Sequence, residues 1–104
     1  MKLLQSYTVK FYTIERMTNL DNLITPENSE AIVEAVNSGI PVPPVYMVQS
    51  RTGKLSPVGR GSAWLAAMHY AAMRTVEVEN AAVTYYIIKP DMDWVGIVRA
   101  AETY

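Results

Sequence analysis

The chain has 104 residues, with nine lysines and arginines against ten acidic residues and a formal net charge of −1. Half of the residues are hydrophobic and 18% are charged, a balance that excludes a disordered chain and predicts one compact domain. Cysteine is absent, which excludes disulfides, thiolate metal sites and thiol nucleophiles. The single histidine, His69, argues against a histidine-based zinc site.

The sequence shows no run of about 20 apolar residues, the length that crosses a membrane, and no secretory-signal pattern. We therefore expect a cytoplasmic protein without membrane contact. The near-zero net charge gives no general attraction to nucleic acid, so DNA or RNA binding would need a local basic patch. The basic residues are too scattered along the sequence to predict one.

The first elements in chain order are a strand and a helix. Residues 6–17 alternate between apolar and polar side chains and are rich in aromatic and β-branched residues, which predicts a half-buried strand. A loop follows, and Thr25 before Pro26 indicates the start of a helix that ends at Gly39.

A hairpin is predicted next. Three prolines within residues 41–44 disfavour a helix and lead, in extended form, into a strand over residues 45–49. A polar turn at residues 51–54 then leads to a short strand over residues 55–58, where Pro57 suits a sheet edge.

The rest of the chain predicts two helices around strands. An alanine-rich helix over residues 64–73 has Ser62 as its expected N-cap, and Pro90 and Asp91 open a last helix over residues 92–104. Residues 76–80 and 81–90 between them alternate as strands.

The predicted order is therefore β-α-β-β-α-β-(β)-α. This order describes a single α+β domain over residues 1–104, a mixed sheet with about three helices, without a second domain.

The loop Gly59-Arg60-Gly61-Ser62 is the first candidate for chemistry, because it joins a strand to a helix N-terminus. Its glycines would let backbone N–H groups approach a phosphate, Arg60 could clamp an oxygen, and Ser62 could donate a hydrogen bond. The spacing is not that of a P-loop. A tight turn with a capping serine explains the same residues, and both interpretations stay open.

Other candidates have ordinary structural explanations beside the functional one. Glu77 and Glu79 alternate on a predicted strand and so share a face, which makes them weak candidates for a Mg²⁺ pair or simply two surface acids. His69 is expected to be structural. Tyr85 and Tyr86 must point to opposite faces of a strand, so at least one is expected to be exposed, where it could contact a partner or stack on a base.

Four pieces follow one another between residues 28 and 102: the helix end EAIVEAVNSG, the segment VPPVYMV, a hairpin leading to a glycine-started box, and a strand at TVEV. This order resembles the N-terminal domain of ParB-like proteins and the ParB/sulfiredoxin superfamily, which includes nuclease-like domains of modification-dependent restriction systems. The resemblance implies an α+β fold with a phosphate-binding box at a helix N-terminus.

The box departs from the family pattern. With Leu65 aligned, Gly61 takes the place of the family glycine, and the positions of the family's Glu-Arg-Arg or x-Gln-Arg hold Ser62, Ala63 and Trp64. A shift of two residues, which puts Gly59 on the glycine, recovers no arginine either. The lack of cysteine excludes sulfiredoxin activity. The helix-turn-helix that follows this domain in ParB proteins is also missing, so centromere-type DNA recognition is not expected.

These observations favour a non-enzymatic, degenerate, stand-alone member that binds a protein partner, itself included, or a nucleic acid. The expected surface is the 59–64 loop with Arg51, Lys54, Trp64 and the tyrosines Tyr85 and Tyr86. Small domains of this kind suit phage, plasmid or other mobile-element contexts, by analogy alone.

Two alternatives remain. In the first, the protein is a nucleotide-binding or phosphodiester-cleaving enzyme in which the Gly59–Ser62 loop cradles the phosphates. An NTP would then bind with Mg²⁺, and Glu77 or Glu79 would hold the ion; otherwise no cofactor is expected. In the second, the family resemblance is accidental and the chain is an unrelated small domain.

Overall fold

The computed structural model describes residues 4–102. Four strands form one mixed sheet in the order β1-β4-β2-β3. The strands are β1 (Gln5–Lys10), β2 (Val45–Gln49), β3 (Leu55–Val58) and β4 (Ala82–Ile88). β4 pairs antiparallel with β1 and parallel with β2, and β2 and β3 form an antiparallel hairpin. The predicted α+β class and mixed sheet are confirmed.

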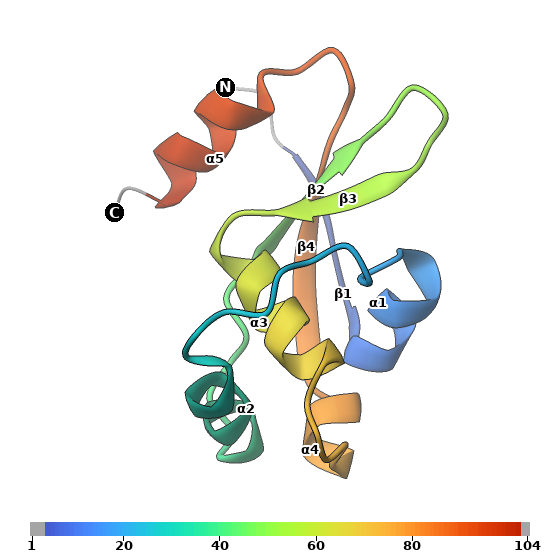
Figure 1. Ribbon diagram of the computed structural model, residues 1–104. Coiled ribbons are helices and arrows are strands. Elements are labelled where there is room, and N and C mark those ends of the chain that lie inside the picture. The colour runs from blue at the N-terminus through green and yellow to red at the C-terminus, as the bar shows by residue number, and fades with distance from the viewer. Residues whose placement is uncertain (1–3, 103–104) are drawn as a thin grey trace.

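Five helices lie within the described residues, more than the three predicted: α1 (Phe11–Met17), α2 (Ser29–Asn37), α3 (Arg60–His69), α4 (Val76–Glu79) and α5 (Trp94–Glu102). α3 packs on β2 and β3, and α1 packs on β1 and β4. α2 packs on α3 and α4 at one end of the molecule, whereas α5 lies at the end that holds the hairpin (Figure 1). Within residues 4–102, no helix has the length and apolar character needed to cross a membrane.

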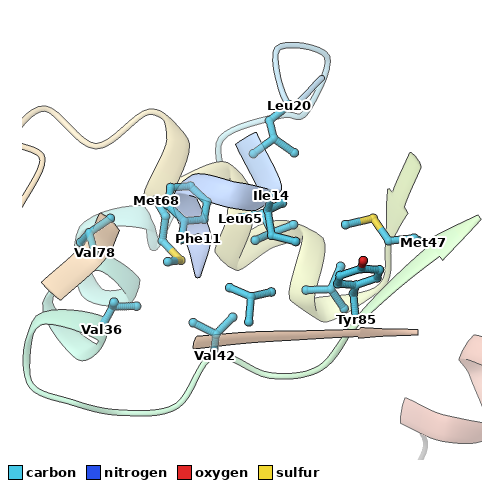
Figure 2. Packing of buried hydrophobic residues seen from close by; sticks show 12 residues of the cluster. Phe11, Ile14, Leu20, Val36, Val42, Met47, Leu65, Met68, Val78 and Tyr85 are labelled. Atoms are coloured by element: carbon cyan, nitrogen blue, oxygen red, sulfur yellow. The ribbon is translucent and has the colours of Figure 1, made fainter. Parts of the chain in front are cut away.

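The hydrophobic core lies between the sheet and the layer formed by α1 and α3. Phe11 and Ile14 of α1 and Leu65 and Met68 of α3 are fully buried, and Figure 2 shows their side chains gathered in one cluster. Met47 of β2 closes the cluster from the sheet. Each fully buried side chain of this size contributes about 1.5–3 kcal/mol, so α1 and α3 are held mainly by this cluster.

The predicted strand over residues 6–17 is wrong beyond Lys10, because the chain turns there into α1. The N–H of Phe11 donates to the carbonyl oxygen of Ala81 (2.9 Å), just where the pairing of β1 with β4 ends. Phe11 and Ile14 are three residues apart and both fully buried, which fits one face of a helix. The aromatic and β-branched composition favoured a strand, and burial of this helix face decided otherwise.

The predicted strand over residues 76–80 is also wrong, because residues 76–79 form the whole of α4 and Asn80 is its C-cap. Thr75 caps this helix: its hydroxyl oxygen accepts the N–H of Val78 (3.1 Å), and Val78 is fully buried. Residues two apart in a helix point about 200° away from each other. Glu77 and Glu79 therefore do not share a face, and the basis for pairing them on one metal is removed.

The bounds of three helices differ from the prediction. α5 begins at Trp94 rather than at residue 92, and α3 ends at His69 rather than at residue 73. α2 begins at Ser29 rather than at Thr25, because residues 26–29 first form a turn in which the N–H of Ser29 donates to the carbonyl oxygen of Pro26 (3.2 Å). α3 begins at Arg60, with Gly59 as its N-cap, so Ser62 lies inside the first turn instead of capping it.

Several local predictions are confirmed. Gly39, which follows the end of α2, has a φ of +88°, and Gly53 in the hairpin turn has a φ of +90°, a region that glycine adopts without strain. Pro57 lies on β3, which is an edge strand. The last helix is present as α5, and the predicted continuation over residues 103–104 lies outside the described residues.

Replacement of Gly61 by alanine tests the close packing of α3 on β2. A Cβ atom at Gly61 would lie 2.6 Å from the carbonyl oxygen of Pro44 and 2.7 Å from Cγ2 of Val45. We expect Gly61→Ala to lower the free energy of unfolding by about 1–3 kcal/mol in a chemical denaturation experiment, although alanine favours helix. Gly96→Ala is the control. The nearest atom there belongs to the Asp93 carboxylate, which accepts the N–H of Gly96 (3.2 Å) but can rotate away from a Cβ atom, whereas the Pro44 backbone cannot. Equal stability of the two variants would contradict the packing.

Candidate functional site

The predicted Gly59–Ser62 box forms the N-cap and first turn of α3. Gly59 has a φ of +82°, which turns the chain from β3 into the helix. Gly61 is buried against the backbone of β2, and the hydroxyl of Ser62 donates to the carbonyl oxygen of Gly59 (2.6 Å). Both residues therefore serve the local turn and its packing.

The helix N-terminus holds a carboxylate of the chain itself. The backbone N–H of Arg60 donates to Oε2 of Glu102 (2.8 Å), and the Arg60 guanidinium donates to the backbone oxygen of the same residue (2.5 Å). Unpaired N–H groups and the helix dipole favour an anion at this place. Glu102 lies in the last turn of α5, so the position where a phosphate was predicted is taken by an anion from 42 residues away.

Two stacked tyrosines come from the inner strands of the sheet. Tyr46 of β2 and Tyr86 of β4 stack with ring centroids 5.3 Å apart. Burial raises the pKa of Tyr46, and the neighbouring Tyr86 and the charge of Glu102 raise it further. The charge of Glu102 therefore acts on the Tyr46 hydroxyl as well as on the start of α3.

The expectation that Tyr85 or Tyr86 is exposed is not met. Tyr85 is only 6% exposed and stacks on Tyr7 with ring centroids 5.4 Å apart. Burial raises the pKa of Tyr85, and the nearby Tyr7 adds to the effect. Tyr86 is half-buried against Tyr46. Each tyrosine is thus used in a stacked pair on its own face of the sheet.

The other predicted surface residues do not gather around the box. Arg51 and Lys54 are exposed in the hairpin turn, and the length of β3 separates that turn from Gly59, roughly 10 Å or more. Trp64 is partly buried and packs against the core. Among residues 4–102, no group of three or more histidine and acidic side chains is placed to hold a metal ion.

A charge cluster that the sequence did not predict surrounds His69 at the end of α3. Nδ1 of His69 lies 2.8 Å from Oε2 of Glu15, and Nε2 lies 2.8 Å from Oδ1 of Asp21. Arg74 binds both oxygens of Glu15, at 2.7 and 3.1 Å. The partners of His69 are 48 and 54 residues away in the sequence, so no local sequence pattern predicts them. The cluster ties α1 and the following loop to α3.

The electrostatics of this cluster favour the charged forms. Burial lowers the pKa of His69, but the hydrogen bonds with Glu15 and Asp21 outweigh it and raise the pKa above its usual range. Burial raises the pKa of Glu15, but the hydrogen bonds from Arg74 and His69 outweigh it and lower that pKa. The cluster is therefore strongest where the imidazolium and the carboxylates coexist.

Two open grooves flank α2 at the end of the molecule away from the hairpin. The first, of about 500 Å³, lies between α2, the following connection and α4, and the second, of about 430 Å³, lies between α2 and the end of α3. Asn37 lines both grooves, and its side-chain oxygen accepts a hydrogen bond from Thr75 (2.5 Å). The Asn37–Thr75 pair thus stands where the two grooves meet.

Exposed apolar side chains line these grooves. Ile40 and Val76 line the first, Tyr70 and Met73 line the second, and Ile24 is the exposed residue before Thr25 of the second. Met73 is 76% exposed and Val76 is 72% exposed. We call the residues of both grooves together with Ile24 the α2 surface.

Comparison of the chain with models of known protein families, with curated proteins and with solved structures finds no match. The resemblance to the ParB/sulfiredoxin superfamily therefore stays a prediction. The extended VPPVYMV segment does lead into β2, as the resemblance implies, but the strand expected at residues 75–78 is replaced by the cap and first residues of α4.

Replacement of His69 by glutamine tests the charge cluster through its pH dependence. Because the pKa of His69 is raised in the folded state, its positive charge stabilises the folded protein in full below the ordinary pKa near 6.5. This stabilisation is lost as the pH rises through the pKa of the folded state. We expect the difference in unfolding free energy between wild type and His69→Gln to be larger at about pH 6 than at about pH 9. Parallel stability curves over this range would contradict the cluster. Glu15 acts in the opposite direction, and its contribution is lost only as pH falls below about 4.5.

Proposed function

We propose that this chain is a non-catalytic binding protein that recognises a protein partner through the α2 surface. The observation that carries the proposal is the gathering of exposed apolar side chains along two open grooves around one helix. Scattered apolar side chains are ordinary on a protein surface, but neighbouring ones that line a groove gain free energy when a partner removes them from water.

The residues of the Gly59–Ser62 box are already used within the fold, which favours a binding protein over an enzyme. Glu102 already uses the N–H of Arg60 at the helix N-terminus, and Gly61 and Ser62 are engaged in packing and in the turn. We propose that the domain is a degenerate relative of the ParB/sulfiredoxin superfamily, in which the box has kept its glycine turn. We propose a cytoplasmic location, and we suggest a phage, plasmid or other mobile-element context by analogy alone.

Photo-crosslinking tests the protein-binding role. A photoreactive amino acid at Met73 or Val76, in cells that naturally produce the chain, is expected to crosslink to one discrete partner. The same amino acid at Thr8, an exposed position on edge strand β1, serves as the control and is expected to give no such product. With the photoreactive amino acid at Val76, the variant Met73→Ser should lose the crosslinked partner while its melting temperature stays unchanged, because the Met73 side chain is exposed. Equal crosslinking from position 8, or a variant that retains the partner, would contradict the proposal.

Nucleotide or phosphate binding is the second candidate function, and one observation favours it. The start of α3 holds a carboxylate through Arg60, so the electrostatics of this place suit an anion. A phosphate could bind there if it displaced Glu102. In that case the side chain of Glu102 acts as a competitor of the ligand.

Thermal unfolding with nucleoside triphosphates and Mg²⁺ tests this second candidate. A ligand at about 100 times its dissociation constant adds about 2.7 kcal/mol, which shifts the melting temperature of a small domain by many degrees. Glu102→Gln should enlarge the shift, because it removes the competing charge, and Arg60→Ala should abolish it. No shift in either the wild type or Glu102→Gln with any of the nucleotides would rule this candidate out.

A further inference from the structure

We propose that the groove between α2 and the end of α3 receives a partner segment whose apolar side chains are flanked by lysine or arginine. This inference rests on the protein-binding function proposed above and specifies the chemistry of the partner. We call this cavity the α2–α3 groove. Its lining includes Glu30, Val33 and Glu34 of α2, Ala67 of α3, and Tyr70 and Met73 just after α3.

The floor of the α2–α3 groove is apolar and made of small residues. Ala67 of α3 is buried and Val33 of α2 is partly buried against the core, and their short side chains leave a space of about 430 Å³ between the helices. Tyr70 and Met73 stand exposed at the rim. The hydroxyl of Tyr70 donates to the backbone oxygen of Asp21 (2.7 Å), which fixes the ring, whereas methionine is flexible and adapts to different apolar surfaces.

The rim of the α2–α3 groove is negatively charged. Glu30 and Glu34 are both exposed and lie four residues apart on α2, so they face the groove from the same side of the helix. Within residues 4–102, neither forms an ion pair. Glu30 lies in the first turn, where the helix dipole favours an acid, but Glu34 lies in the second half of α2, where the dipole does not. Glu34 therefore has neither an ion-pair partner nor a favourable dipole position in the described fold, and its charge is open to a partner.

The basic side chains of the described chain do not neutralise this rim. No lysine or arginine lines the α2–α3 groove, and Arg74, which lies next to it in sequence, is held by Glu15. Arg51 and Lys54 lie in the hairpin turn, at the far end of the molecule (Figure 1). The groove thus combines an apolar floor with uncompensated negative charge. Such a surface repels acidic partners and nucleic acid and attracts a basic, apolar segment.

Two synthetic helical peptides of equal length test the inference. Both carry leucine at the same helical spacing, and their polar positions are all lysine in one and all glutamate in the other. We expect the lysine peptide to bind the wild-type chain in a fluorescence anisotropy titration and the glutamate peptide not to bind. In an NMR titration, the amide signals of Ala67 and Tyr70 should shift, and that of Thr8 on the sheet should not.

Variants separate the charge from the apolar contact. Glu34→Gln should weaken the lysine peptide about two- to fivefold, the effect of losing one exposed ion pair. Asp91→Asn removes the same charge at an exposed position in the loop before α5 and should leave affinity unchanged. Met73→Ser should weaken binding about tenfold, because it removes a buried apolar contact from the complex. Unchanged melting temperatures confirm that each variant folds.

Each contrary result has its own meaning. Failure of the lysine peptide to bind, equal binding of both peptides, or an equal loss with Glu34→Gln and Asp91→Asn would overturn the basic-partner inference. If the basic-partner inference failed but Met73→Ser still abolished crosslinking from Val76 to the natural partner, the protein-binding function would stand. Dimerisation of the chain that Met73→Ser abolishes, seen by sedimentation velocity, would show that a second copy fills the groove and would also overturn the inference.

Discussion

α3 begins in close contact with the backbone that leads into β2, and Gly61 is the residue that makes this approach possible. A side chain at this position would run into the carbonyl oxygen of Pro44 and the side chain of Val45, so only glycine lets the helix start so near the strand. This contact fixes the direction of α3. Leu65 and Met68 then face the core, and the N–H of Arg60 faces the place that Glu102 occupies.

Opposite charges hold the two ends of α3. The carboxylate of Glu102 lies at the N-terminus, and His69, whose charged form its acidic neighbours favour, lies at the C-terminus. Both arrangements agree with the helix dipole, which favours an anion at the start of a helix and a cation at its end. α5 and α1 each make polar contacts with an end of this helix, in the case of α1 in addition to the apolar cluster that it shares with α3. α2 packs on α3 as well and leaves open grooves at its sides.

Local signals predicted the parts of the fold that local interactions determine. Prolines and Gly53 located the hairpin, and Gly39 located the end of α2, because these residues restrict or extend the backbone angles on their own. α1 and α4 were missed because their short patterns fit a strand as well, and only burial of Phe11 and Val78 decides for the helix. The contacts of Glu102 and His69 join residues more than 40 positions apart, which no spacing rule reveals.

The position of β4 in the sheet also determines when the protein can fold during its synthesis. β4 is an inner strand that pairs with β1 on one side and β2 on the other, so the sheet is split into separate pieces without it. The hydroxyls of Thr8 and Thr84, hydrogen-bonded across the β1–β4 pair, are 76 residues apart in the chain. β1 therefore has no partner strand in the sheet until the chain has been synthesised through β4, and before that point only the β2–β3 hairpin and the preceding helices can form.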